Sequence, residues 1–249
     1  MNKVINTILN HRSIRNFKDE PLQDEHIKII VESAQMASTS SYIQAYTIIG
    51  VKDRKTKSKL ANLAGNQSYV EQNGHFFVFC ADLHRHACAG KMENVDVQMS
   101  LQSTEKFMVA IIDASLAAQN AAIAAESLGL GICYIGGIRN NLEKVSNLLK
   151  LPKYVVPLFG LAVGVPASST EQKPRLPFDH IYHEEVYQQN ETDYIDQLNK
   201  YNSTISSYYN KRTNGKRKDR WTEQMATMLS TPKRTNMKEF LQGKGYLKD

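Results

Sequence analysis

The sequence contains little that would suit a secreted or membrane-bound protein. Its three cysteines, Cys80, Cys88 and Cys133, are an odd number without paired spacing, so they predict neither a disulfide framework nor a zinc site. The N-terminal residues lack the apolar stretch of a signal peptide. The most apolar run, residues 107–137, is interrupted by polar side chains and is therefore a poor membrane span. We expect a cytoplasmic protein.

Common catalytic and nucleotide-binding motifs are also missing. The chain has no GxGxxG after a strand, no GxxxxGK[ST], no GxSxG and no HExxH. His84, His86 and Cys88 lie close together, but in a segment that we predict to be irregular and that has no matching second cluster. We therefore predict no metal site and no catalytic triad.

Charge is distributed unevenly along an otherwise ordinary composition. The chain has 249 residues, of which 41% are hydrophobic and 22% charged, as in soluble globular proteins. The net charge is +6, and residues 200–249 hold twelve Lys or Arg against four Asp or Glu, so the rest is nearly neutral. A basic, tyrosine-containing end would suit a nucleic-acid-binding protein. The near-neutral body and the lack of a nucleic-acid motif favour instead an enzyme with an anionic ligand.

Hydrophobic periodicity predicts a chain of alternating helices and strands, an α/β or α+β body. Strands are predicted at 45–51, 75–82, 132–135 and 155–164. Helices are predicted at 3–10, 24–37, 53–63, 104–128, 141–149, 193–210, 219–229 and 236–242.

Two of these elements carry a further prediction. Pro157 lies near the start of its strand, which indicates either an edge strand or a strand beginning. The helix at 104–128 is rich in alanine and apolar around most of its circumference, so we expect it to be central and buried. Its pattern fits the core of a monomer and a core shared by two chains equally well.

The pentapeptide at residues 11–15 concentrates N–H and O–H donors with almost no acceptors. Such a stretch is either a phosphate-binding turn or a solvated basic turn. Gly136 and Gly137 follow a predicted strand, where glycines let a ligand press against backbone N–H groups. Lys173 and Arg175 are held at a fixed spacing by the proline between them.

Taken in order along the chain, these stretches resemble the nitroreductase superfamily. The matching segments are His11-Arg12-Ser13-Ile14-Arg15, the hydroxyl run before Gln44, Gln67, Tyr134-Ile135-Gly136-Gly137, Lys173-Pro174-Arg175-Leu176-Pro177 and the basic loop before Trp221. Within the superfamily the chain is similar to the NADPH-dependent, FMN-containing group of oxygen-insensitive nitroreductases and flavin reductases. The resemblance covers about residues 3–245.

The resemblance implies an α+β fold in which a central, mostly antiparallel sheet is flanked by helices. It implies one nitroreductase-like domain over residues 1–249, with a helical C-terminal extension from about 184 to 249 that carries the basic NADPH loop. Two chains would intertwine as a homodimer, with an FMN at each of two interface sites. One of Thr39, Ser40 and Ser41 would enter the site of the partner chain.

It also implies which residues bind the two nucleotides. The FMN set is His11, Arg12, Ser13, Arg15, Gln67, Tyr134, Ile135, Gly136, Gly137, Lys173 and Arg175. Within it, His11, Arg12, Ser13, Lys173 and Arg175 would surround the phosphate and ribityl chain. Arg15 would approach flavin N1 and the C2 oxygen, Gln67 the pyrimidine edge, and the Gly136 N–H the N5 region. The NADPH 2′-phosphate would meet Arg212 and Arg217 first, and then Lys216 and Lys218.

The implied activity is a ping-pong transfer of hydride from NADPH through FMN to a small acceptor. Nitroaromatics, quinones, azo dyes and free flavin are candidate acceptors, and a physiological FMN reductase is an alternative description. No side chain needs to act as catalytic acid or base, because the cofactor carries the chemistry. Two rival hypotheses are a basic nucleic-acid-binding protein and a module that only carries FMN.

Overall fold

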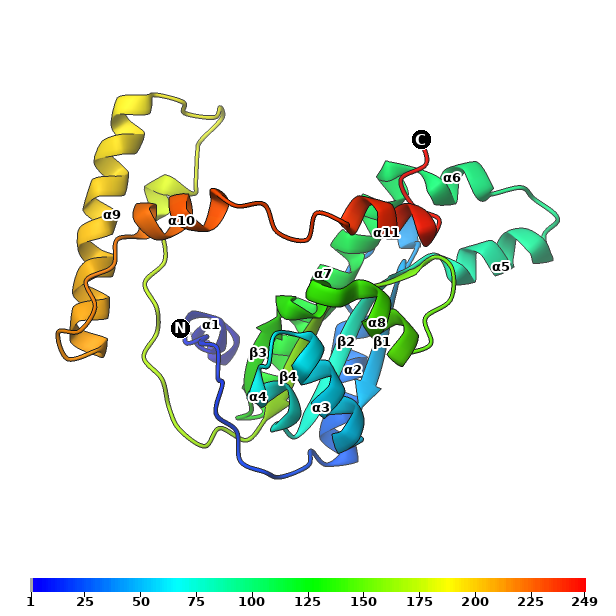
Figure 1. Cartoon of the computed structure of the whole chain (residues 1–249), viewed down its shortest axis with the longest axis horizontal. Helices are drawn as coiled ribbons and strands as arrows, with labels where there is room; N and C mark the ends of the chain where they lie inside the picture. Colours follow the sequence, from blue (N-terminus) through cyan, green and yellow to red (C-terminus); the bar gives the residue numbers. More distant parts are fainter. Residues whose placement is uncertain (1) are drawn as a thin grey trace. The chain divides into compact units, whose positions relative to one another are not determined.

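The structure is a computed structural model that describes residues 2–249, and it contains two compact units. The sheet unit comprises the chain up to Thr170 together with Arg234–Asp249, and the helical unit is Glu171–Lys233. Figure 1 shows the elements of both units along the chain. Each unit is described by itself below.

The sheet unit is built on four strands in the order β1-β2-β4-β3, and every neighbouring pair is antiparallel. The strands are β1 (Tyr46–Val51), β2 (His75–Asp82), β3 (Gly131–Ile135) and β4 (Val155–Gly164). All eight residues of β2 are buried, which places this strand at the centre of the core. The predicted α+β fold with a mostly antiparallel sheet is confirmed.

Strand β4 corrects one of the sequence alternatives, because it lies between β2 and β3 and is not an edge strand. Pro157 is its third residue and pairs with Cys80, where the register shifts between Phe79 and Cys80. An irregularity in the ladder accommodates a residue without an N–H donor. The remaining alternative, a proline near the beginning of a strand, is the correct one.

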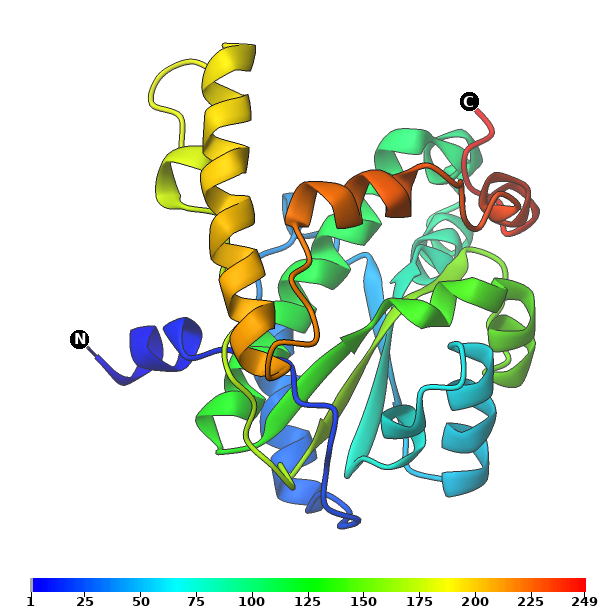
Figure 2. The same cartoon turned by 60° about the vertical axis from the view of Figure 1, so that its left-hand side comes forward.

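Helices cover both faces of the sheet, and the alternation of β2 side chains assigns them to two cores. Phe77 and Phe79 pack in the core that contains α7 (Thr104–Ser127) and α2 (Asp24–Gln35). On the other face, Phe76 and Val78 pack in the core that contains α3, α4 and α8, and Figure 2 shows the same arrangement from a second direction. These helices are α3 (Arg54–Leu63), α4 (Ser68–Glu71) and α8 (Leu142–Leu148).

Helix α7 is the predicted central helix, and small residues let it approach the sheet closely. Its buried positions include Ala110, Ala114, Ala117, Ala118, Ala121, Ala122 and Ala125. By length and composition alone α7 would also suffice to cross a membrane, but it forms part of the core against α2 and the sheet. Its outer side remains apolar, since Met108, Ile112 and Leu116 are 52%, 47% and 44% exposed.

The segment after β2 is helical, contrary to the irregular structure predicted for it. It forms α5 (His84–Met92) and α6 (Gln98–Gln102). Asp82 precedes the N-cap residue Leu83 of α5 and accepts the His84 backbone N–H at 2.9 Å. His86 and Arg85 are engaged with backbone carbonyls of Ile43 and Tyr46. Among residues 2–249 no group of three or more His, Cys, Asp or Glu is placed to hold a metal ion.

The two ends of the chain both belong to the sheet unit. Helix α1 (Lys3–Leu9) begins at Asn2, whose side chain accepts the Ile5 N–H at 3.0 Å. Helix α11 (Met237–Gly243) is followed by Tyr246, which is fully buried and donates its hydroxyl hydrogen to the Tyr154 carbonyl at 2.6 Å. The last residues therefore complete the core instead of forming a loose tail.

The helical unit contains η3 (Phe178–His180), α9 (Glu191–Arg212) and α10 (Trp221–Leu229). Its small core consists of Tyr201, Ile205 and Tyr209 of α9, with Leu176, Tyr208 and Trp221 packed against them. A reciprocal pair of hydrogen bonds between Asn202 and Thr222 joins α10 to α9, at 2.9 and 3.1 Å.

Candidate functional site

The pentapeptide at residues 11–15 runs beside β3 and extends the sheet at that edge. Ser13 forms a parallel bridge with Ile132, and the Ile14 N–H donates to the Ile132 carbonyl at 2.8 Å. The Ile14 side chain fills the space over Gly131, where an added Cβ would lie 2.8 Å from the Ile14 Cβ. Because neighbouring residues of an extended segment point to opposite sides, the pentapeptide presents two different faces.

One face carries Ser13 and Arg15. Ser13 lies beside the Cys133 thiol, and the Arg15 guanidinium lies near the Tyr69 hydroxyl. Burial raises the pKa of Tyr69 and of Cys133, and the nearby Arg15 charge opposes both shifts. Tyr69 also donates to Gln67 Oε1 at 2.8 Å, so one phenol positions both Arg15 and Gln67.

Gly137 lies against the same group of side chains. An added Cβ there would be 2.2 Å from the Ala64 carbonyl oxygen and 3.0 Å from Gln67 Nε2, so only glycine fits. Gln67 Nε2 itself donates to the Ala64 oxygen at 3.0 Å. Ser13, Arg15, Gln67 and Gly137, with Tyr69, constitute what we call the β3-edge cluster. It brings together donors from three segments that are distant in sequence.

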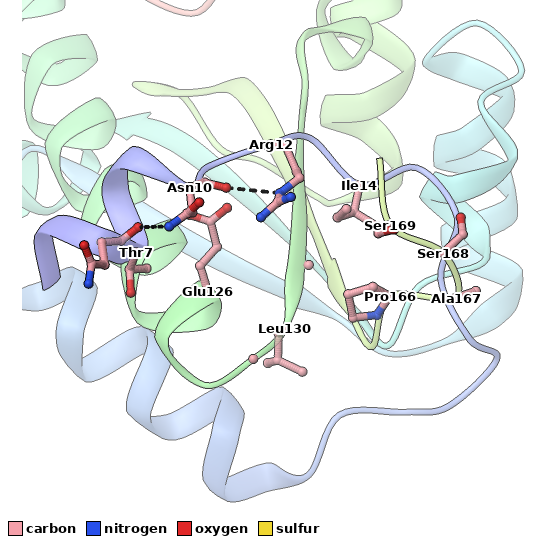
Figure 3. A pocket seen from close by; sticks show the side chains of 13 residues that line it. Thr7, Asn10, Arg12, Ile14, Glu126, Leu130, Pro166, Ala167, Ser168 and Ser169 are labelled. Carbon is pink, nitrogen blue, oxygen red and sulfur yellow. Dashed lines mark hydrogen bonds between the residues drawn. The ribbon is translucent and has the colours of Figure 1, made fainter. Parts of the chain in front are cut away.

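Arg12 lies on the other side of the pentapeptide, and His11 before it is paired with a carboxylate of α7. His11 Nδ1 is 2.7 Å from Glu126 Oε1 at the end of α7. Arg12 lines a cavity of about 700 Å³, shown in Figure 3, with Glu126 and Asn10 nearby and Ser168 and Ser169 on another wall. The residues of the β3-edge cluster do not line this cavity. Arg12 and Arg15, which were predicted to contact different ends of one ligand, therefore face different sides of the pentapeptide.

The residues after β3 have different exposures. Tyr134 is 37% exposed and packs edge-on against Phe159, with ring centroids 5.7 Å apart. Ile135 is 1% exposed, so its side chain belongs to the core and only its backbone is available to a ligand. Gly136 begins η2 (Gly136–Asn141), directly beside Gly137.

The predicted hydroxyl run lies in a loop that is fixed by a buried carboxylate. Asp113 of α7 is fully buried and accepts the backbone N–H groups of Ser40 at 3.0 Å and Ala45 at 2.9 Å. Between them, Ser41, Tyr42 and Gln44 have φ values of 47°, 59° and 52°, in the left-handed region that non-glycine residues seldom adopt. Ser40 and Ser41 are exposed at the tip of this loop.

In the helical unit the predicted cations pack on tyrosine rings. Lys173 Nζ lies 5.4 Å and the Arg217 guanidinium carbon 4.4 Å from the centroid of the Tyr209 ring. Arg212 lies over Tyr208 at 5.8 Å and donates to its hydroxyl at 2.9 Å. Arg175 contributes a charge that acts on Tyr201. Lys216 and Lys218 are exposed in the loop between α9 and α10.

Four residues that position these groups were not found from the sequence, namely Tyr69, Asp113, Glu126 and Tyr209. Tyr69 follows Gln67 by two residues, but nothing in that spacing indicates a contact with Arg15. Asp113 and Glu126 were noted only as polar interruptions of an apolar run. Their position within an alanine-rich buried helix was the one available indication of a structural role, because a buried carboxylate needs hydrogen-bond donors around it.

Comparisons with known proteins agree with this architecture. Residues 8–165 match the family described as "Nitroreductase family", and residues 173–249 match "Nitroreductase family, C-terminal domain". The chain belongs to the nitroreductase family. It is 55% identical over 249 residues to the "FMN reductase (NADPH)" of Bacillus subtilis, with 100% of both chains covered.

Solved nitroreductase-family structures are similar over the whole chain. The structure of NfrA1 from B. megaterium has a TM-score of 0.98 at 66% identity, covering 99% of this chain and 100% of that one. A structure of the NADPH:FMN oxidoreductase from Vibrio harveyi complexed with NAD+ has a TM-score of 0.90 at 38% identity, with 100% of both chains covered. The two family matches of this nitroreductase meet close to Thr170, where its two units also divide.

Proposed function

We propose that this nitroreductase-family protein is an NADPH-dependent FMN oxidoreductase. The observation that carries the proposal is the β3-edge cluster, in which Arg15, Ser13 and Gln67 converge beside a glycine that tolerates no side chain. Relatives that match over the full chain are named for NADPH and FMN, which supports the same assignment. The bound FMN would accept hydride from NADPH and pass the electrons to an oxidised acceptor in a ping-pong cycle.

The chemistry of the β3-edge cluster fits an isoalloxazine ring system. Its Arg15 and Gln67 side chains offer a guanidinium and an amide, the groups that a pyrimidine edge with carbonyl oxygens would bind. The narrow space beside Gly137 lets a flat ligand approach backbone N–H groups closely. Arg15 would face the pyrimidine end, where a cation stabilises the negative charge of the reduced ring. Gln67 would bind the same edge, and Tyr69 would hold both side chains in place.

The phosphate end would use the remaining cations. His11, Arg12 and Ser13 would act there together with Lys173 and Arg175, and charge-assisted bonds to phosphate contribute about 1.5–3 kcal/mol each. The pairing of His11 with Glu126 holds its ring in one orientation. Tyr134 and the backbone of Ile135 and Gly136 would line the ring near N5. No side chain of the site is assigned a catalytic acid or base role.

The C-terminal extension, from about residue 184 to 249, would carry the NADPH loop of this single nitroreductase-like domain. Arg212 and Arg217 are the proposed readers of the 2′-phosphate, with Lys216 and Lys218 as secondary contacts. Both arginines lie on the face of a tyrosine of α9, which limits their rotamers. Such partly fixed guanidinium groups favour recognition of an anion.

We further propose a cytoplasmic homodimer. Helix α1 has no buried residue, and its Val4, Ile5, Ile8 and Leu9 are 44–60% exposed. Helix α7, with which α1 is in contact, adds the exposed side chains of Met108, Ile112 and Leu116. A second chain that covered this apolar surface would also bring the Ser40–Tyr42 loop near the partner's flavin. In the proposed dimer, α7 would contribute to a core shared by two chains.

A purified sample tests the proposal directly. The protein should be yellow, or should take up added FMN in equimolar amount, and it should oxidise NADPH in the presence of a quinone. Parallel assays with nitroaromatic, azo and free-flavin acceptors would rank the substrates and test the alternative of a physiological FMN reductase. Protein that takes up no FMN would contradict the proposal. Uptake of FMN without NADPH oxidation would instead support the flavin-carrying module.

A further inference from the structure

In the helical unit, the carboxylate of Asp219 accepts hydrogen bonds from the guanidinium of Arg217. Arg217 donates to Asp219 Oδ2 from Nε at 3.0 Å and also from Nη2. Gln224 of α10 donates to the same oxygen at 2.7 Å. The Asp219 side chain is 27% exposed and that of Arg217 is 52% exposed, so the carboxylate is the better fixed partner of the pair.

This contact belongs to a continuous network on the Tyr209 ring. Lys173 and Arg217 both lie over that ring, and Gln224 lies near the Tyr209 hydroxyl. Gln224 in turn donates a hydrogen bond to Asp219. The network fixes the position of the carboxylate relative to the guanidinium. Arg217 is therefore held by aromatic packing on one side and by Asp219 along its N–H edge.

An incoming phosphate would meet this carboxylate. Asp219 and Gln224 line a cavity of about 870 Å³ whose walls belong entirely to the helical unit. A phosphate monoester needs adjacent N–H groups of a guanidinium for a bidentate bond, and in Arg217 the Nε and Nη2 groups are engaged by Asp219. Before it could take that edge, the phosphate would have to displace an anion of like charge.

We propose that Asp219 is a specificity-determining residue that lowers the preference of this protein for a nucleoside 2′-phosphate by competing for Arg217. This inference rests on the proposed use of NADPH. NADH carries no 2′-phosphate, and so its binding is independent of the competition. The strength of the Asp219–Arg217 contact would then determine the ratio of the affinity for NADPH to the affinity for NADH.

The test compares Asp219→Asn with the wild-type holoprotein. Asparagine keeps an oxygen for Gln224 and Arg217 but removes the charge. We expect NADP+ binding, measured by calorimetry, to tighten by about three- to tenfold, as for removal of one partly exposed like charge beside a phosphate. NAD+ binding should change less than about twofold by the same reasoning, and the KM values for NADPH and NADH should follow the same pattern.

Asp196→Asn is the matched control, because it makes the same chemical change at an exposed position of α9. It should leave the affinities for both nucleotides unchanged. In an Arg217→Ala background, Asp219→Asn should no longer tighten NADP+ binding. Weaker NADP+ binding in Asp219→Asn, an equal gain for NAD+, or an equal gain in Asp196→Asn would overturn the inference. Failure of the wild-type protein to oxidise NADPH would refute the proposed function itself.

Discussion

At the scale of single residues, Arg217 is predicted to contribute to NADPH binding and not to NADH binding. Arg217→Ala removes one charged hydrogen bond from the proposed 2′-phosphate contact, worth about 1.5–3 kcal/mol. We expect the KM for NADPH to rise about tenfold or more, since about 1.4 kcal/mol corresponds to a factor of ten. The KM for NADH should be nearly unchanged. Steady-state assays with both nicotinamides measure this difference, and an equal loss for both would show that Arg217 does not read the phosphate.

His75 is a buried titratable residue whose charge state links stability to pH. Burial, aided by the charges of Lys52 and Lys57, lowers the pKa of His75 to about 4, from 6.5. The folded protein therefore keeps His75 neutral down to about pH 4, while the unfolded chain takes up the proton below about pH 6.5. The free energy of unfolding should fall by about 3 kcal/mol as the pH decreases across this window.

The variant His75→Gln isolates this contribution. Other groups also titrate, so the informative quantity is the difference between the pH slopes of the two proteins in urea unfolding at fixed protein concentration. The slope between pH 4.5 and 6.5 should be smaller in His75→Gln than in the wild type. His84→Gln is the control, because it makes the same substitution at an exposed histidine. Equal slopes in wild type and His75→Gln would mean that His75 takes up its proton equally in the folded and unfolded protein.

At the scale of elements, Asp113 connects the central helix to the hydroxyl loop. Its two oxygens accept backbone N–H groups on either side of three residues with positive φ. Asp113→Ala would leave these donors unsatisfied, at a cost of about 1–3 kcal/mol for each buried group. We expect Asp113→Ala to lower the free energy of unfolding by about 2–5 kcal/mol and Asp113→Asn by less, because asparagine retains one acceptor.

A second measurement separates stability from ligand binding. The loop presents Ser40 and Ser41, so Asp113→Ala should also weaken FMN binding to protein that is still folded, as measured by titration of the apoprotein. Asp96→Ala is the control, since Asp96 accepts the Gln98 N–H at 2.9 Å on an exposed helix start. The control should change stability by less than about 1 kcal/mol and leave FMN affinity intact. Unchanged FMN binding in Asp113→Ala would show that the loop does not contact the flavin.

Some helices and strands could be predicted from the sequence, and others could not. Helices and strands with a clear apolar period, such as α7 and β2, were located within one or two residues. The helix α5 was missed because its N-cap residue, Leu83, makes no side-chain capping bond and only Gly90 of the helix is buried, so the local sequence has little helical pattern. Ser13, Arg15, Gln67 and Gly137 were among the FMN residues that the resemblance implied. Their position around Tyr69 depends on side-chain directions. Those directions follow from tertiary packing and are absent from the local sequence.

At the scale of the whole molecule, the exposed apolar stripe on α1 and α7 predicts that a single chain is incomplete. Ile112 and Leu116 are adjacent on the outer side of α7, at i and i+4, and both are more than 40% exposed in the isolated chain. Burial of each such side chain by a partner would contribute about 1.5–3 kcal/mol. The double variant Ile112→Glu/Leu116→Glu would place two like charges in that contact and should yield monomers.

Sedimentation of the purified variant measures the oligomeric state, and FMN titration measures the consequence for the site. If the partner's Ser40–Tyr42 loop completes each flavin site, the monomer should bind FMN at least about tenfold more weakly. This corresponds to a loss of about 1.4 kcal/mol of binding free energy, the size expected for losing about one hydrogen bond from that loop. Asn62→Glu, which adds a charge at an exposed position of α3, should remain dimeric and bind FMN normally. A monomeric variant with wild-type FMN affinity would show that each chain binds its flavin alone, and a dimeric one would place the interface elsewhere.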